Sequence, residues 1–252
     1  MPFTVTTADR IAELVLDHPP VNAFDSAGWF DLARTIEETG RDENVNCLLI
    51  RAEGRGFCAG VDIKELQADG SRITRVNKGC YDTFAAIHDC KVPVIVAVHG
   101  FCLGGGIGMA GSADIVLASE DASFGLPEID RGALGAASHL YRMFPMQKVR
   151  RMLYTGESIS AAEAYRHGSI ESVVPADRLA AEARALAAKI ASKSGKALRL
   201  AKESLDGIEL LDVKRSYRFE QGFTLELYTS PDSQEARDAF VEKRDADFSG
   251  KK

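Results

Sequence analysis

The chain has 252 residues, of which 45% are hydrophobic and 27% are charged, with a net charge of −6. This composition is typical of a globular protein with one large core or a core plus a small second domain, and the acidic balance argues against nonspecific binding to nucleic acid. The five cysteines form no Cys-x-x-Cys pair, which argues against a disulfide framework or a zinc site. No apolar run reaches the roughly 18 residues of a membrane span, and residues 1–10 lack the pattern of a secretory signal, so we expect a cytoplasmic protein.

Short strands and amphipathic helices alternate through the first half of the chain. The strands that we expect lie at residues 11–16, 47–50, 94–98, 113–118 and 170–174. The second and third of these are continuous apolar runs, which indicates strands buried on both faces. Helical spacing of apolar residues predicts helices at residues 29–36, 73–90, 179–190 and 198–205.

The chain changes character near residue 176, beyond which we expect helices and no further strand. We therefore divide it into an α/β core, residues 1–195, and a helical C-terminal region, residues 196–252. Helices with an apolar stripe must bury that stripe, so the region either folds over its own core or packs against a neighbouring subunit. The pattern leaves both arrangements open.

Two glycine-rich loops directly follow predicted buried strands. The first is Glu53-Gly-Arg-Gly-Phe-Cys-Ala-Gly-Val-Asp-Ile-Lys-Glu65, and the second is His99-Gly-Phe-Cys-Leu-Gly-Gly-Gly-Ile-Gly108. Glycine lets a ligand approach the main chain, and the glycines at 104–106 should open a short helix whose free N–H groups point outward. Two such loops at adjacent strand ends can direct two N–H donors at one oxygen, which is the arrangement of an oxyanion hole. Taken singly, each loop could equally be a tight turn.

The second loop also contains Gly106-Ile-Gly-Met-Ala-Gly111, which fits the Gly-x-Gly-x-x-Gly pattern of dinucleotide-binding proteins. In that class the pattern follows its strand at once and opens a crossover helix of about a dozen residues. Here several residues separate the pattern from its strand, and the next strand begins near residue 113. Glu120 and Asp121 also come too early for the acidic residue expected about 20 positions on. These departures disfavour a dehydrogenase.

Three motifs in order, Gly56-Phe-Cys-Ala-Gly-Val-Asp-Ile-Lys64, Gly100-Phe-Cys-Leu-Gly-Gly-Gly106 and Phe124-Gly-Leu-Pro-Glu128, together resemble the crotonase (enoyl-CoA hydratase/isomerase) superfamily. The resemblance covers essentially the whole chain, including residues 238–244. It implies an α/β fold, a spiral of stacked ββα units, with a helical C-terminal region that builds homotrimers, often as dimers of trimers. It also implies an enzyme that stabilises the enolate of an acyl-CoA thioester. Coenzyme A is then part of the substrate, and no separate cofactor, metal, nucleic acid or membrane is expected.

The resemblance assigns roles to individual positions. The backbone N–H groups of Val61 and Gly105 match the two oxyanion donors, and Glu128 matches a catalytic acid/base. The positions that match contacts to coenzyme A are Val21, Ala23, Ala59, Asp62, Ile63 and Lys64 and, reaching the coenzyme A of an adjacent subunit, Phe240 and Lys243. Lys64 and Lys243 could supply the positive charge that an acidic protein needs to hold phosphates, although an isolated lysine is more often simply solvated.

Hydratases of this family use two glutamates, and one of the two positions corresponds to Gly108, which has no side chain. Because water addition needs groups that position water and deliver its proton, we expect hydration to be poor. A single carboxylate, Glu128, suits proton transfer between two carbons, as in a double-bond isomerase, or activation of water against a β-keto thioester.

Two further stretches bear on the substrate. Residues 131–139 and 216–223 resemble the actinobacterial steroid-degradation branch of the family, which hydrolytically opens a ring of a bicyclic CoA thioester. We therefore expect this hydrolysis, with isomerisation as the alternative. The rival from another class is a CoA-binding scaffold without catalysis, which would have no need of a carboxylate at Glu128.

Several other residues admit two interpretations. Gly108, Arg131 and His139 are candidates for the acyl pocket, but a salt-bridged Arg131 and a His139 at a helix start are equally plausible. Cys58 and Cys102 flank the glycine loops, so a thiol nucleophile beside a histidine must be considered. Small buried packing residues are the favoured interpretation, since nothing indicates a lowered thiol pKa.

Overall fold

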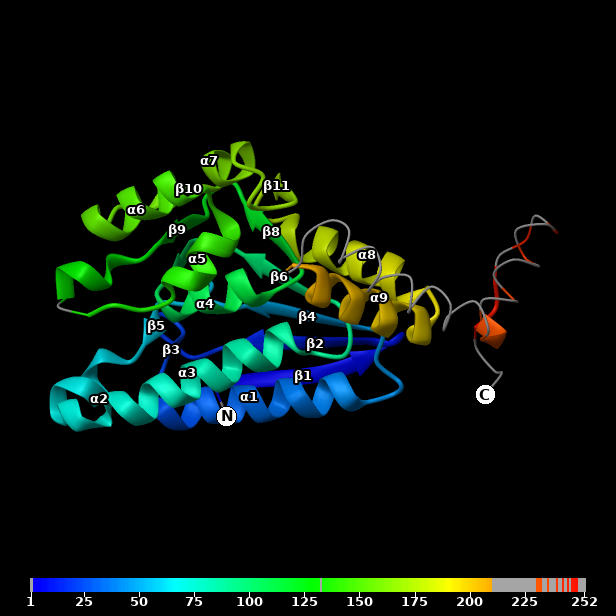
Figure 1. The fold of residues 1–252 in the computed structure, drawn as a ribbon, viewed down its shortest axis with the longest axis horizontal. Coiled ribbons are helices and arrows are strands. Elements are labelled where there is room, and N and C mark those ends of the chain that lie inside the picture. The colour runs from blue at the N-terminus through cyan, green and yellow to red at the C-terminus, as the bar shows by residue number, and fades with distance from the viewer. Residues whose placement is uncertain are drawn as a thin grey trace.

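The computed structural model describes residues 2–131 and 133–209, together with residues 230–232, 235, 239, 242, 244 and 246–248 near the C-terminus. Its centre is a six-stranded sheet ordered β1-β2-β4-β6-β8-β11 (Figure 1). The first two strands are antiparallel, and every other neighbouring pair is parallel. The strands are Phe3–Ala8 (β1), Ile11–Leu16 (β2), Cys47–Ala52 (β4), Val94–Val98 (β6), Ile115–Ser119 (β8) and Ser172–Val174 (β11).

Short strands form a second layer, and four of them, β3, β5, β7 and β9, each follow a strand of the large sheet. In this layer β3 (Ala23–Phe24) pairs with β5 (Gly60–Val61), and β7 (Phe101–Leu103) pairs with β9 (Ser123–Gly125), which also pairs with β10 (Ile159–Ser160). An isolated β-bridge, which is a parallel backbone pairing between Cys58 and Cys102 and not a disulfide, links the two groups. The order of sheet strand, short strand and helix repeats along the chain, and this confirms the predicted α/β spiral of ββα units.

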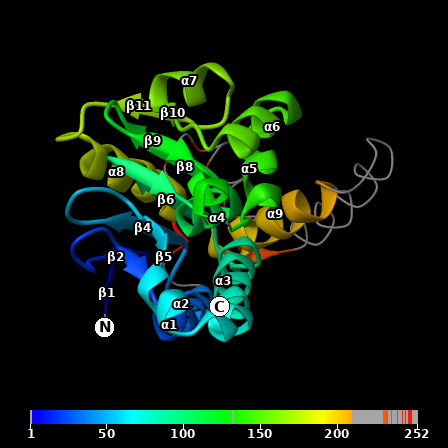
Figure 2. The same ribbon diagram turned by 90° about the vertical axis from the view of Figure 1, so that its left-hand side faces the viewer.

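The helices cover both faces of the large sheet. They are Ser26–Arg41 (α1), Ile63–Ala68 (α2), Ile73–His88 (α3), Gly105–Ser112 (α4), Ala137–Met143 (α5), Met146–Thr155 (α6), Ala161–Arg166 (α7), Leu179–Ala191 (α8) and Gly195–Ile208 (α9), with 3₁₀ turns at Gly70–Arg72 (η1) and Pro127–Arg131 (η2). Figure 1 shows α1 and α3 side by side beneath the sheet, and Figure 2 shows α8 on the sheet's other side. None of the helices in the described part of the chain is long and apolar enough to cross a membrane.

Burial of the central strands on both faces follows from these layers. Leu48 and Ile50 of β4 belong to the main core between the sheet and helices α1 and α3. Cys47 and Leu49 point to the other face and pack in a second cluster with α8. All residues of β6 are buried. The continuous apolar runs are therefore two-sided strands, as predicted.

Two expected strands begin later than predicted. The strand expected at residues 170–174 is β11, which begins at Ser172. For the strand expected at residues 113–118, β8 begins only at Ile115, because α4 extends to Ser112. Asp114 lies between α4 and β8, and its side chain bonds to β6. Its Oδ2 accepts a hydrogen bond from the backbone N–H of Val94 at 2.7 Å.

The first helix of the C-terminal region packs on its own core. Arg199 of α9 donates to the carbonyl oxygens of Gly40 (2.8 Å) and Asp42 (2.9 Å). The Nζ atom of Lys202 lies 2.8 Å from Oδ1 of Asp114, with Lys202 itself buried. The division of the chain at residue 195 stays a prediction.

Candidate active site

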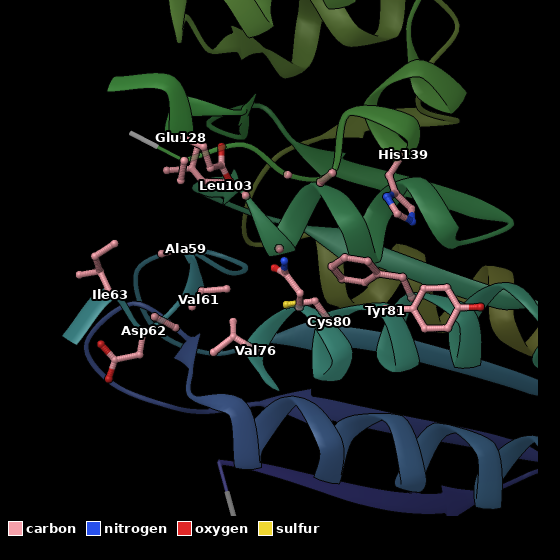
Figure 3. A pocket seen from close by; sticks show the side chains of 18 of the residues that line it. Ala59, Val61, Asp62, Ile63, Val76, Cys80, Tyr81, Leu103, Glu128 and His139 are labelled. Atoms are coloured by element: carbon pink, nitrogen blue, oxygen red, sulfur yellow. The ribbon is translucent and has the colours of Figure 1, made fainter. Parts of the chain in front are cut away.

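A cavity of about 1190 Å³ gathers most of the predicted site residues. Those that line it are Val21, Ala23, Ala59, Val61, Asp62, Ile63, Lys64, Gly105, Glu128 and His139. Figure 3 shows Val61 and Ile63 at one end, Glu128 across the gap from them, and His139 farther along, toward Tyr81. The segments around the two glycine loops therefore meet at one site, with room that continues beyond it.

The two glycine loops touch where the oxyanion donors are predicted. Gly60 has φ +92°, and a Cβ atom there would lie 2.9 Å from the backbone nitrogen of Gly105. Only glycine permits both this conformation and this approach without strain. Gly105 is the first residue of α4, so its N–H has no acceptor inside the helix. Its amide and that of Val61 thus belong to segments in direct contact, and both residues line the cavity.

The carboxylate of Glu128 lies against the same loops. It sits in η2, which follows β9 and begins at Pro127. A methyl group on Gly104 would overlap Oε1 of Glu128, and the φ of +55° at Gly104 is one that glycine adopts readily. Because Gly104 adjoins Gly105, the glycine run leaves space for the carboxylate of Glu128, the predicted acid/base, next to the predicted oxyanion donor.

The space beside Gly108 is filled by an aromatic ring. A Cβ atom at Gly108 would overlap the Phe84 ring, with ring atom Cε1 only 2.5 Å away. Phe84 lies on α3 and is almost fully buried, with 9% of its surface exposed. Its ring makes edge contacts with Trp29 (5.8 Å between centroids) and His139 (4.8 Å). The turn that carries it is anchored by Thr83, whose hydroxyl donates to the carbonyl of Trp29 at 2.7 Å.

The far end of the cavity, beyond Phe84, is polar. Its lining there comes from α3, α4 and α5 and includes His88, Asp89, Ser112, Ser138, His139 and Arg142. Burial lowers the pKa of His139, and the positive charges of Arg142 and His88 lower this pKa further. The imidazole of His139 is therefore held in its neutral form to lower pH than an exposed histidine.

The thiols near the glycine loops are not poised to react. Cys58 and Cys102 are fully buried, and burial raises the pKa of Cys58 to about 12 and that of Cys102 well above its usual value. Burial also raises the pKa of Cys80, which lines the cavity, to about 12. A thiol with so high a pKa carries almost no thiolate at neutral pH, which favours packing roles.

Four predicted positions are not among the residues that line the cavity. Gly108 lies behind the Phe84 ring. Arg131 ends η2, but its side chain lies outside what the structure describes. Phe240 and Lys243 also lie outside the described residues.

Sequence reasoning missed Phe84 and Arg142 as parts of this site. Phe84 shares the apolar stripe of α3 with Val76, which also lines the cavity, and with Ile87, which packs in the core, so periodicity alone cannot distinguish it. The available signal was Gly108 itself, because a missing side chain in a packed interior requires another group to fill its space.

Comparisons with known proteins identify the family of the chain. Residues 6–251 match the family model described as enoyl-CoA hydratase/isomerase. A protein of Rhodococcus jostii named "(7aS)-7a-methyl-1,5-dioxo-2,3,5,6,7,7a-hexahydro-1H-indene-carboxyl-CoA hydrolase" is 52% identical over 95% of this chain and 93% of its own length. A Mycobacterium tuberculosis protein of the same name is 48% identical over 96% of this chain and 100% of its own. The crystal structure of human enoyl Coenzyme A hydratase domain-containing protein 3 superposes with a TM-score of 0.94 at 30% identity, covering 98% of this chain and 100% of that one. The chain belongs to the enoyl-CoA hydratase/isomerase family and is an enzyme of that superfamily.

Proposed function

We propose that the protein hydrolyses a carbon–carbon bond in a bicyclic β-keto acyl-CoA thioester and so opens one ring. Two relatives at 52% and 48% identity are named as hydrolases of an indene-carboxyl-CoA that carries two oxo groups. The single observation that carries the proposal is the Phe84 ring against Gly108. It gives the acyl site an apolar wall where a hydratase of this family is expected to hold its second carboxylate.

The carboxylates around the cavity support a mechanism with one acid/base. In the described part of the chain, those that line it are Asp62, Asp89 and Glu128. Asp62 caps α2 by accepting a hydrogen bond from the N–H of Lys64 at 3.0 Å. The Asp89 carboxylate lies 2.8 Å from Nδ1 of His88. Glu128 is the carboxylate that lies against Gly104, next to the predicted oxyanion donor Gly105.

The proposed reaction adds one water across the bond that breaks. Glu128 takes a proton from water, and the resulting hydroxide adds to the ring carbonyl β to the thioester. The tetrahedral intermediate then breaks the bond between that carbon and the α-carbon, and the electron pair passes to the thioester as an enolate. The N–H groups of Val61 and Gly105 stabilise the enolate oxygen, and protonated Glu128 returns its proton to the α-carbon. The new carboxylic acid remains attached to the same molecule and ionises in solvent.

We assign the binding of coenzyme A to the end of the cavity away from His139. Val21, Ala23, Ala59 and Ile63 supply apolar and backbone surface there, and the exposed Lys64 supplies positive charge.

Phe240 and Lys243 are proposed to reach the coenzyme A of a neighbouring subunit. On this basis we propose a homotrimer or a dimer of trimers that works in the cytoplasm, and light scattering that detects a stable monomer at micromolar concentration would contradict the assembly.

A side-by-side assay with three thioesters tests the reaction type. The substrates are crotonyl-CoA, a 3-enoyl-CoA and a bicyclic β-keto acyl-CoA, each followed by mass spectrometry in oxygen-labelled water. We expect the bicyclic thioester to gain one water and to carry the label in its new carboxylate. Vigorous turnover of crotonyl-CoA alone would overturn the proposal.

The second candidate is a double-bond isomerase, because one carboxylate beside an oxyanion hole can also move a proton between two carbons. Clean migration of the double bond in the 3-enoyl-CoA, without hydrolysis of the bicyclic thioester, would favour it. A CoA-binding scaffold would leave all three thioesters unchanged.

A further inference from the structure

The acyl end of the cavity has a fixed length, which helix α4 sets. Gly105 begins this helix at the predicted oxyanion site, and Gly111 lies near its other end. At about 1.5 Å of rise per residue, Gly111 is roughly 9 Å farther along the axis. A Cβ atom on Gly111 would lie 2.8 Å from Cβ of His139, so His139 stands at that far end. A group that contacts His139 is therefore remote from the reacting thioester.

Most polar groups at this end already have partners within the protein. Arg142 donates from Nη1 to the carbonyl oxygens of Gly111 (2.8 Å) and Ala113 (3.1 Å), and from Nη2 to Glu209 (2.6 Å). The Ser112 hydroxyl donates to the carbonyl of Gly108 at 2.8 Å. These bonds connect α4, α5 and Glu209, the residue that follows α9.

His139 differs from its neighbours in this respect. Its ring lines the cavity, yet its Nδ1 atom is buried and neither accepts nor donates a hydrogen bond within the described residues. A buried polar atom without a partner is costly, and such atoms are rare unless a ligand or water completes them. A flip of the imidazole about its Cβ–Cγ bond exchanges Nδ1 with Cδ2 and Nε2 with Cε1 and changes the shape of the ring little. The flip therefore decides whether a nitrogen or a carbon of the ring faces the cavity.

The protonation state of His139 selects the kind of group that it would bind. Its lowered pKa, caused first by burial and then by Arg142 and His88, keeps the ring neutral near pH 7. A neutral imidazole offers one N–H donor and no net charge. This suits a carbonyl oxygen better than a carboxylate, which a cation would bind more strongly.

We propose that His139 donates a hydrogen bond to a second carbonyl on the distal ring of the acyl group, with the Phe84 ring packing beside the bicyclic skeleton. The inference rests on the proposed function, because ring opening consumes one carbonyl of the substrate class and leaves the other for recognition. His139 thereby sets specificity for dioxo over mono-oxo bicyclic thioesters. It is a positioning residue and takes no part in the bond cleavage.

The test pairs two substrates with three variants. The substrates are a dioxo bicyclic β-keto acyl-CoA and its analogue in which the distal carbonyl is a methylene group. His139→Phe keeps an aromatic ring against Phe84 but removes the donor, and His139→Gln restores a donor without the ring. His18→Phe is the matched control, since His18 also lines the cavity but stacks on Phe24, at 5.7 Å between ring centroids, and not on Phe84.

We expect His139→Phe to lower kcat/KM for the dioxo substrate by about 5- to 20-fold and to change that for the analogue by less than about 2-fold. His139→Gln should recover part of the preference, while His18→Phe should affect both substrates alike. Turnover of the analogue also reports that the variant is folded. Equal losses of kcat/KM on both substrates would overturn the proposal and leave His139 a packing residue. No loss of kcat/KM on either substrate would overturn it as well.

This outcome is separable from a failure of the proposed function. If the wild-type protein hydrolyses both thioesters with no preference, ring opening stands and the role of His139 falls. If the wild-type protein hydrolyses neither, the proposed function itself falls.

Discussion

Replacing Gly108 by alanine tests whether Phe84 occupies the space that a second carboxylate would need. A methyl group there would lie 2.5 Å or less from three atoms of the Phe84 ring, and real Cβ atoms essentially never approach other atoms within 3.0 Å. The ring cannot retreat freely, because Trp29 and His139 contact it edge-on from two other elements. The easiest relief is a rotation of the ring into the cavity.

The expected effect on stability is modest, and the effect on catalysis is larger. An extra methyl group in a packed core costs about 1–3 kcal/mol, and alanine in place of glycine inside a helix returns about 1 kcal/mol. The balance is a loss of about 0–2 kcal/mol, which lowers the Tm of a chain of this size by up to roughly 8 °C. A Phe84 ring displaced into the acyl site should misplace the substrate, and we expect kcat/KM for the bicyclic thioester to fall roughly 10- to 100-fold.

A double-mutant cycle with Phe84→Ala measures the contact directly. If the ring is the obstacle, Phe84→Ala removes it, and the unfolding free energies of Gly108→Ala and Phe84→Ala should be coupled by about 1–2 kcal/mol. Gly70→Ala is the control, because nothing lies within 4 Å of a Cβ atom there. Additive effects, together with a Gly108→Ala variant as active as the wild type, would refute the assignment of this space to Phe84.

Three other changes test separate parts of the structure. Glu128→Gln keeps the shape of the side chain but removes the base, so kcat should fall about 10²- to 10⁴-fold with little change in KM; near-normal turnover would remove Glu128 from the mechanism. Lys202→Met leaves Asp114 without the ammonium group 2.8 Å away and should lower the unfolding free energy by about 3 kcal/mol in urea denaturation, whereas an unchanged midpoint would show that the pair contributes nothing. Because the pKa of His139 is lowered in the folded protein, the unfolded chain binds a proton more readily as pH falls below about 6.5, so stability is lost in that direction. His139→Phe should therefore lose less stability than the wild type between pH 7 and 5, and parallel curves would contradict this.

The sequence predicted the features that depend on local pattern. Continuous apolar runs placed β4 and β6 between two layers, since only a strand covered on both faces needs apolar residues at every position. The glycines at 104–106 predicted the start of α4, because glycine both ends the preceding loop and permits close approach of the backbone. The carboxylate and both proposed oxyanion donors came from ordered motifs, and all three residues line the same cavity.

Features that depend on contacts between distant elements could not be predicted. Nothing in the spacing of α3 indicates that Phe84 faces Gly108 of α4, because its apolar neighbours on the same stripe are buried as well. The polar end of the cavity depends on Arg142 reaching Gly111 and Glu209, which are 31 and 67 residues away in the chain. Sequence patterns report which face of an element is buried, and they do not report which partner buries it.

The pairing of Gly108 with Phe84 constrains how this site can change its chemistry. A glycine alone at position 108 would leave a void, which costs packing energy. A phenylalanine at position 84 would clash with a side chain at position 108 of α4. The two residues must therefore change together if a second carboxylate is to stand there. Gly108→Glu by itself should produce an inactive protein and no hydratase, whereas Gly108→Glu combined with Phe84→Ala has room for the carboxylate. Hydration of crotonyl-CoA by the single variant, at a rate matching the double variant, would show that the ring never excluded the second glutamate.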